Sequence, residues 1–467
     1  MPKIRSLLLM PLLATLTLAC SEQEPTGTAI TNVTLIDAIN GVRPNQTVIF
    51  ENDVITAVQP ASAEVNAANT YDGTGKYLIP GLWDFHVHLS YDERLTAAMA
   101  DIFLTWGITS VRDTGGLMEN MLPVVRTMRA EDATAPRVFF AGPLLDGEHV
   151  VYNGVGRPEI GVPVPTPEDA RRIVAELAEQ GVDFIKVYEM LTPETFTTLV
   201  QTATAAGLPV DSHVPLSMRA RTAGPQVQSI EHLRNIEMDC ANNAEQLHNT
   251  RLEHLANPNN LSGADLRASL HTLQRIPAIQ NYAEAECDTV IAALSNTVMV
   301  PTLRLNSFAL LPAYNSNNNW QAALRGTPPI VQEDWTAQSI ARTEQPPTDT
   351  RFADWSLFLT GRMHTAGVPV AAGTDTPINL AIPGYSLHEE LEMLVRAGLS
   401  EMDALEAATL TPAKWFGIDD TLGSIDVGKQ ADLVLLGDDP LLDIKNTQDI
   451  WLVVSKGTVV IEVVITD

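Results

Sequence analysis

The stretch GLWDFHVHLS, residues 81–90, places His86 and His88 two positions apart in an otherwise apolar run. On a β-strand, side chains at positions i and i+2 project from the same face, so the two imidazoles would point the same way. Neutral imidazole is the commonest metal ligand in proteins, and two on one strand can bind a single cation. For an isolated pair the alternative is two hydrogen-bonded histidines near the surface, so the rest of the chain must decide.

Four more polar residues stand in or at the ends of apolar, strand-like segments. These are Lys186 in FIKVY, His213 in DSHVP, His232 in SIEH and Asp375 in AAGTD. Lys186 is the least expected, because an ammonium group within a buried strand is costly unless it is paired or neutral. Burial and nearby cations depress a lysine pKa, and a neutral amine can take up CO2 to form a carbamate able to bridge two metals. The alternative is a Lys186 that forms a salt bridge with Asp375 or Glu189.

The segments that carry these residues predict parallel βα units. The helical patterns PEDARRIVAELAEQG and PETFTTLVQTATAAG each start at a Pro that follows a Thr, end at a Gly and lead into an apolar strand. Repeated units of this length are typical of a parallel sheet, and eight of them favour a (β/α)8 barrel, an α/β fold, over an open doubly wound sheet. The predicted strands are 80–88, 109–113, 137–141, 183–188, 208–213, 228–232, 297–303 and 368–375.

In such a barrel the carboxyl ends of the strands meet at one mouth, so the six polar residues become neighbours. This convergence favours metal ligation by His86 and His88. No G-x-G-x-x-G motif follows an early strand, which leaves a dinucleotide-binding fold little support. Polar segments at 238–296 and 305–360 fall at the same face, where lids belong, and the Asn, Pro and Gln content of the second predicts irregular structure.

Both ends of the chain are rich in short β patterns broken by turns. We expect one small β-sandwich domain built from residues 29–80 and 418–467. The barrel would then occupy 81–417, with its insertions at 238–360.

The N-terminus, MPKIRSLLLMPLLATLTLAC, has two basic residues, an apolar run and then Cys20. We interpret residues 1–19 as an export signal, too short for a stable membrane span. It resembles a bacterial lipoprotein signal, which would make 20–28 a lipidated Cys and a tether and would place the protein in the periplasm or on the outer membrane. Simple secretory cleavage is the alternative, because Thr17 stands where such signals usually carry Leu.

Cysteine usage and charge exclude some classes of partner. Cys240 and Cys287 should pair in an oxidising compartment, with two free buried thiols as the alternative. The formal charge of −28, from 57 acidic and 29 basic residues, makes nucleic acid an improbable partner. Membrane contact is expected only through Cys20, and the oligomeric state is left open.

With these motifs in this order, the sequence resembles the amidohydrolase superfamily, metal-dependent hydrolases with a (β/α)8 barrel and a β-sandwich built from both chain ends. GLWDFHVHL, FIKVY, SHV, SIEH and AAGTDT match its ligand motifs, and VTLIDA and GSIDVGKQADLVLL match its sandwich segments. The likeness is greatest to the branch of imidazolonepropionase-like proteins and Xaa-Pro dipeptidases, and it covers nearly everything from residue 28 onward except the insertions. It implies two divalent cations, one held by His86, His88 and Asp375 and one by His213 and His232, with a carboxylated Lys186 between them.

This resemblance implies hydrolysis of an amide bond in a small peptide or N-acyl amino acid. Zn²⁺ suits the mixed imidazole and oxygen ligands, although Mn²⁺ or Co²⁺ could substitute. A hydroxide shared by the two cations would attack the substrate carbonyl, and Asp375 would move the proton to the leaving amine.

Substrate contacts are expected from two further residues. His149, in GEHVVYNG, resembles a loop histidine that faces substrate in this branch, with a solvated loop residue as the alternative. Tyr188 shares the inward face with Lys186 and either contacts substrate or fills the barrel mouth. The remaining insertion histidines are expected at the surface; these are His248, His254 and His271.

Two other functions fit part of the pattern. A deaminase or a cyclic-amide or lactone hydrolase of the same fold would use one metal, and Lys186 argues against it. An exported lipoprotein that binds a metal or a small solute without turnover would leave the acid at the end of the eighth strand unexplained.

Overall fold

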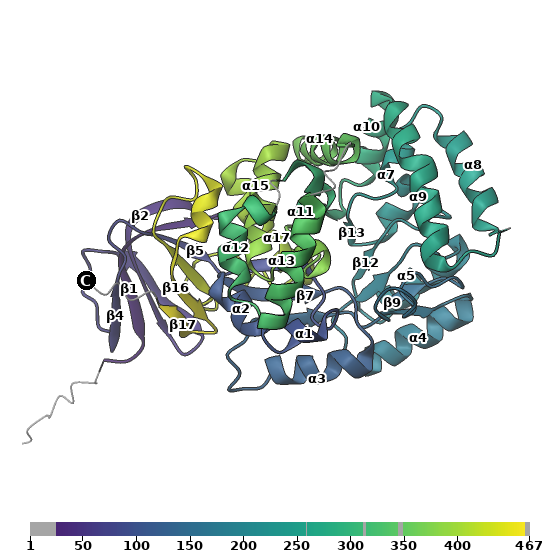
Figure 1. Ribbon diagram of the computed structural model, residues 1–467. Helices are drawn as coiled ribbons and strands as arrows, with labels where there is room; N and C mark the ends of the chain where they lie inside the picture. Colours follow the sequence, from purple (N-terminus) through teal and green to yellow (C-terminus); the bar gives the residue numbers. More distant parts are fainter. Residues whose placement is uncertain (1–24, 258, 312–313, 344–348, 463–467) are drawn as a thin grey trace, which may run out of the picture.

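The computed structural model describes residues 25–257, 259–311, 314–343 and 349–462 (Figure 1). The predicted export signal and Cys20 lie outside these residues. Strands from the two chain ends, purple and yellow in Figure 1, lie together at one side of the molecule. The barrel strands follow in the middle, and a group of helices from the first insertion lies at the far side.

Strands from both chain ends form one eight-stranded sheet. They are β1 (Thr28–Asp37), β2 (Gly41–Glu51), β3 (Val54–Pro60), β4 (Asn69–Asp72), β5 (Tyr77–Pro80), β15 (Leu433–Leu436), β16 (Ile450–Ser455) and β17 (Thr458–Glu462). The order is β17-β16-β15-β5-β1-β2-β3, with β4 paired to β1. Antiparallel pairing of β5 with β15 places Leu433 opposite Pro80 and thereby joins the two ends. Alternating apolar residues such as Val33, Val48 and Leu435 pack into one separate core.

The barrel consists of parallel strands, as the βα pattern predicted. They are β6 (Leu82–Val87), β7 (Ile108–Asp113), β8 (Arg137–Phe140), β9 (Leu144–Asp146), β11 (Ile185–Val187), β12 (Val210–Ser212), β13 (Ser229–Glu231) and β14 (Val298–Val300), with β10 (Gly161–Pro163) added beside β9. The sheets β6-β7-β8 and β10-β9-β11-β12-β13-β14 form the two halves of the barrel wall, and the chain passes from one to the other between β8 and β9.

The predicted strand 368–375 is wrong as a regular strand. Val370 and Thr376 form isolated bridges to Met299 and Val87, and these bridges close the ring between β14 and β6. Asp375 has a positive φ of 62°, which takes the backbone out of the extended region and interrupts the ladder. The predicted α/β fold class, a (β/α)8 barrel with a β domain from both chain ends, is confirmed.

Helices surround the barrel and complete its repeats. They are α1 (Glu93–Thr96), α2 (Met99–Thr105), α3 (Met118–Met128), α4 (Pro167–Glu179), α5 (Pro193–Ala205), α6 (Ala220–Ala223), α15 (Tyr385–Ala397), α16 (Glu401–Ala407) and α17 (Leu410–Phe416). α4 and α5 begin as predicted, with Pro as the first residue of each helix. The Thr166 and Thr192 side chains each accept a hydrogen bond from the backbone N–H of the third helix residue.

The first insertion is helical and contains α7 (Ile236–Asp239), α8 (Ala244–Leu255), α9 (Gly263–Gln280) and α10 (Glu284–Ala293). The predicted disulfide is confirmed, because Cys240 at the end of α7 is bonded to Cys287 in α10. Both cysteines are fully buried. The disulfide therefore joins the first and last helices of this insertion and does not connect it to the barrel.

The second insertion was expected to be irregular, and that expectation is wrong. It contains α11 (Leu303–Asn306), α12 (Asn318–Leu324), α13 (Pro329–Thr343) and α14 (Arg351–Thr365). Its Asn and Pro residues start helices: the Asn317 side chain caps α12, and Pro329 is the first residue of α13. Trp320, Trp335 and Trp355 are buried and anchor the segment. Among the helices described, none is long and apolar enough to cross a membrane.

Candidate metal centre

The barrel brings the six predicted ligand residues to one cavity. His86 and His88 come from β6 and the turn after it, and Lys186 comes from β11. His213 and His232 directly follow β12 and β13, and Asp375 lies in the segment that closes the barrel. All six line a single cavity of about 150 Å³.

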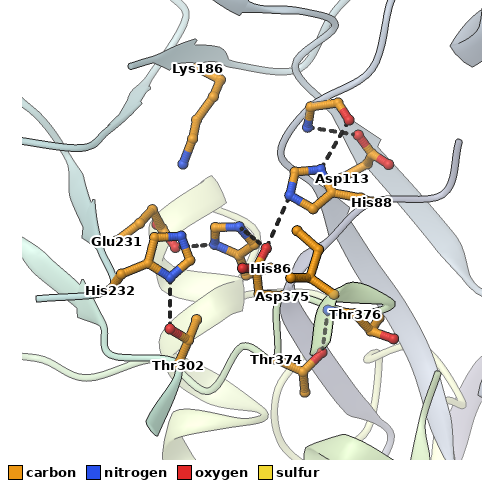
Figure 2. Close-up of polar contacts among 12 residues, drawn as sticks. His86, His88, Asp113, Lys186, Glu231, His232, Thr302, Thr374, Asp375 and Thr376 are labelled. Carbon is orange, nitrogen blue, oxygen red and sulfur yellow. Dashed lines mark hydrogen bonds and ion pairs between the residues drawn. The ribbon is translucent and has the colours of Figure 1, made fainter. Parts of the chain in front are cut away.

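The donor atoms converge on Asp375. Its Oδ1 atom lies 3.2 Å from Nε2 of His86 and 3.1 Å from Nε2 of His88. Donor atoms of His86, His232 and Asp375 lie within 4.8 Å of one another. The His213 and His232 rings have centroids 4.8 Å apart, and Figure 2 shows Lys186 extending toward His86 and His232. The chain thus gathers imidazole nitrogens and one carboxylate around a common point.

The Nδ1 atom of each histidine has its own partner, so Nε2 is the nitrogen left for a ligand. Nδ1 of His86 contacts the Glu231 carboxylate, as the dashed lines of Figure 2 show. An acceptor on Nδ1 fixes the proton there and directs the Nε2 lone pair away from it, which is the usual arrangement behind metal-binding histidines. The other Nδ1 contacts are His88 with the Gly115 carbonyl at 3.0 Å, His213 with Glu189 Oε1 at 2.8 Å and His232 with Thr302 Oγ1 at 2.7 Å.

Two of the site residues adopt left-handed backbone conformations. His232 has φ 63° and Asp375 has φ 62°, which for a residue other than glycine costs about 1–3 kcal/mol and is found most often at functional sites. The carboxylate of Asp84 holds the segment before Asp375, since it accepts hydrogen bonds from the Thr374 N–H at 3.0 Å and hydroxyl at 2.6 Å. A side chain at Gly373 would stand 2.7 Å from Cβ of His86, so this close approach requires glycine.

Behind the histidines lies a buried network of four charges. Lys186 Nζ donates to Asp211 Oδ2 at 2.8 Å, and Arg112 Nη2 donates to Glu231 Oε1 at 2.7 Å. Arg112 also lies 3.9 Å from Asp211. The salt-bridge alternative for Lys186 named Asp375 or Glu189, and the partner is instead Asp211. Two cations and two carboxylates compensate one another, as buried charges require.

Burial and neighbouring charges set the protonation of the site. Burial lowers the pKa of His213 to about 3 and holds the pKa of His232 well below its usual range. Burial would raise the pKa of Asp375, but His232 and His86 outweigh it and keep that carboxyl ionised. Burial alone would lower the pKa of His86. The carboxylates of Glu231 and Asp375 outweigh burial and raise it. The space between the Asp375 carboxylate and the neutral imidazoles of His213 and His232 therefore favours a cation.

The two predicted substrate contacts have different locations. Tyr188 lines the cavity, and its ring lies 4.4 Å from that of His213 between centroids. His149 is half-buried in the loop after β9 and is not among the lining residues. His271 was expected at the surface, which is wrong: from α9 its Nε2 contacts Glu189 Oε2 at 2.9 Å.

Sequence reasoning missed the residues that hold the ligands in place. Glu231 directly precedes His232, and Glu189 follows Lys186 by three residues. An acidic residue this close to a candidate ligand was the sequence signal that could have identified both. Three arginines of the cavity wall gave no signal of their own; they are Arg157, Arg234 and Arg267.

Comparisons with known proteins match parts of this sequence and its fold. The model for the amidohydrolase family matches residues 359–465. Adenine deaminases of Desulforamulus reducens and Serratia proteamaculans are 30% and 32% identical over 89 and 112 residues, 19% and 24% of this chain. The matched segments span only 15% and 19% of those two relatives.

Several solved structures have the same fold. A Xaa-Pro dipeptidase with methionine bound in its active site has a TM-score of 0.65 at 20% identity, over 93% of this chain and 99% of that one. Molinate hydrolase has a TM-score of 0.64 at 22% identity, over 94% and 95%. Ochratoxinase of A. niger has a TM-score of 0.65 at 20% identity, over 95% and 98%.

Proposed function

We propose that this chain, a member of the amidohydrolase superfamily, is a metal-dependent hydrolase that cleaves an amide bond of a small peptide or N-acyl amino acid. The observation that carries the proposal is the convergence of histidine Nε2 atoms and the Asp375 carboxylate in one cavity, with every Nδ1 atom engaged elsewhere. A solute-binding pocket has no need of imidazoles oriented in this way.

The donor set fits two divalent cations. His86, His88 and Asp375 would hold one, and His213 and His232 the other. Lys186 would connect them as a carbamate formed with CO2. Zn²⁺ suits such mixed nitrogen and oxygen ligands best, and Mn²⁺ or Co²⁺ could replace it. Two cations bound there would supply hydroxide near neutral pH and polarise the substrate carbonyl.

The side chains of this site would handle the proton and the substrate. Asp375, ionised and within 3.2 Å of two imidazoles, can accept a proton from the attacking water and return it to the leaving amine. Its orientation is held by the Asp84–Thr374 hydrogen bonds behind it. Tyr188 and the apolar residues of the wall would orient the substrate and exclude bulk water; the latter are Leu144, Ile160, Leu305 and Ile378.

The short adenine deaminase matches favour a deaminase as the alternative. The deaminase considered above would use a single cation. Lys186 is the discriminating residue, because one cation held by histidines and Asp375 needs no bridging ligand. Metal content per chain therefore separates these two functions.

A panel of N-acyl amino acids and dipeptides, incubated with protein before and after chelation, tests the proposed function. We expect release of the free amine from at least one compound, its loss with chelator and its return when Zn²⁺ and bicarbonate are added. Fully metal-loaded protein that cleaves none of the amides but binds one of them would contradict hydrolysis and support a solute-binding protein.

A further inference from the structure

Three arginines line the same cavity as the candidate metal ligands: Arg157, Arg234 and Arg267. Arg267 is neutralised, since its Nη2 donates to Glu189 Oε1 at 2.8 Å. Within the described residues, Arg157 and Arg234 have no carboxylate partner. Arg157 instead lies over the Tyr152 ring, 5.3 Å from its centroid. Two uncompensated guanidinium groups therefore share a cavity with the proposed reaction centre.

This charge distribution is unusual for the molecule. The chain carries a formal charge of −28, yet among the described residues Asp375 is the only acid that lines the cavity. Lys186 is compensated by Asp211, which leaves Arg157 and Arg234 as the unpaired cations of the wall. Both are partly buried, and a partly buried cation without a partner is costly unless a ligand supplies the opposite charge.

Arg234 lies close to the chemistry. It is two residues beyond His232, and its positive charge reaches three neighbours in the cavity. It helps to lower the pKa of His213 and His232, and it opposes the rise that burial causes in the pKa of Tyr188. Arg267 adds an Nε–H that is buried without a partner among the described residues. Guanidinium groups present fixed, planar donors that match carboxylates in bidentate geometry, so this wall suits carboxylates better than any neutral group.

We propose that the substrate is an N-acylated acidic amino acid, an aspartate or glutamate derivative, whose two carboxylates are bound by Arg234 and Arg157. This inference rests on the proposed function and names its substrate class. Two unpaired cations match two carboxylates, whereas a substrate with one carboxylate would leave one guanidinium uncompensated. In the reaction, water adds across the amide C–N bond: the acyl carbon gains oxygen to become a carboxylate, and the nitrogen leaves as the amine of the acidic amino acid.

The decisive comparison is between N-acetylglutamate and N-acetylglutamine, which differ by a single charge. For the Zn²⁺-loaded protein we expect kcat/KM to favour N-acetylglutamate or N-acetylaspartate over the neutral analogues by roughly 100-fold or more, because the neutral compounds leave a guanidinium unpaired. Arg234→Met and Arg157→Met should each reduce this preference at least about tenfold, mainly through KM. Arg171→Met, an exposed arginine of α4, is the matched control and should keep the preference.

Metal content and circular dichroism of each variant show whether it is folded and loaded. Equal hydrolysis of acidic and neutral compounds, or a preference that survives in both variants, would overturn the proposal while leaving the hydrolase function intact. If no amide is cleaved at all, the hydrolase function fails. Calorimetric binding of N-acetylglutamate against N-acetylglutamine then decides the acidic-ligand proposal alone, and equal affinities would overturn it.

Discussion

At the scale of single residues, Asp375 is where metal binding and proton transfer can be separated. Asp375→Asn keeps a carbonyl oxygen near His86 and His88 but can no longer accept a proton. We expect kcat to fall roughly 10²–10⁴-fold, as for loss of a general acid–base group, while most of the metal is retained. Parallel measurement of kcat and metal content checks this. Wild-type kcat at full metal occupancy would contradict the role of Asp375 as a proton shuttle.

Lys186 is the residue that distinguishes a carbamate ligand from a structural ion pair with Asp211. Lys186→Ala should lose one of the two cations and most activity under the carbamate hypothesis. Bicarbonate with a short carboxylic acid, such as formate, should partly restore both by filling the space of the bridge. Loss of the ion pair alone would destabilise the fold by about 3–5 kcal/mol, and added acid would not reverse it. Lys414→Ala, on an exposed face of α17, is the control. Activity and metal loss without rescue would therefore favour the ion pair.

The sequence identified ligands at this scale but not their partners. His86 and His88 could be predicted because strand periodicity fixes the side on which each imidazole lies. Asp211 could not be paired with Lys186, since that contact depends on the register between β11 and β12, which places the two residues opposite each other. Register between parallel strands is set by packing of the whole barrel, which no local pattern encodes.

At the scale of elements, α9 connects the first insertion to the metal centre. Arg267 and His271, four residues apart on one face, contact the two oxygens of Glu189, which in turn accepts the Nδ1–H of His213. His271→Ala should weaken binding of the cation at His213 roughly 10–100-fold, as loss of such supporting contacts does. Competition with a chromogenic chelator measures it. His254→Ala, on exposed α8 of the same insertion, is the control, and equal metal retention in the two variants would contradict this role for α9.

The disulfide constrains the same insertion. Cys240 and Cys287 are 47 residues apart, and closing a loop of that length stabilises the folded state by about 4 kcal/mol in the chain-entropy account. We therefore expect Cys240→Ser with Cys287→Ser to lower the free energy of unfolding. Alkylation followed by mass analysis should label neither thiol before reduction and both after it. Two alkylated thiols in unreduced, exported protein would contradict the pairing.

Elements were predictable where local signals are strong. α4 and α5 have a capping Thr, an initial Pro and a terminal Gly nearby, so their limits followed from the sequence. The helices of 303–365 did not, because their formation depends on burial of Trp320, Trp335 and Trp355 against distant segments. Asn and Pro there were interpreted as loop signals although several of them start helices.

At the scale of the whole molecule, the eight-stranded sheet combines strands from both ends of the chain, and the barrel is closed by a segment near the C-terminal end. The family match at 359–465 begins in α14, includes Asp375 and runs through the strands β15 to β17 that pair with the N-terminal strands. In a chain with a formal charge of −28, two cavity arginines without a carboxylate partner among the described residues would make the site the place that attracts an anionic substrate. Export to the periplasm or outer membrane stays a prediction, which N-terminal analysis of the mature protein would test.

The most direct test of the central claim is a titration of metal-free protein with Zn²⁺ in the presence of bicarbonate, with amide hydrolysis and bound metal measured at each step. We predict that activity rises to a plateau at about two Zn²⁺ per chain, because hydroxide formation and carbonyl polarisation are shared between two cations. A plateau at about one Zn²⁺ would contradict the two-metal site and support the mononuclear alternative, and hydrolysis that is equally fast without metal would contradict the metal-dependent mechanism altogether.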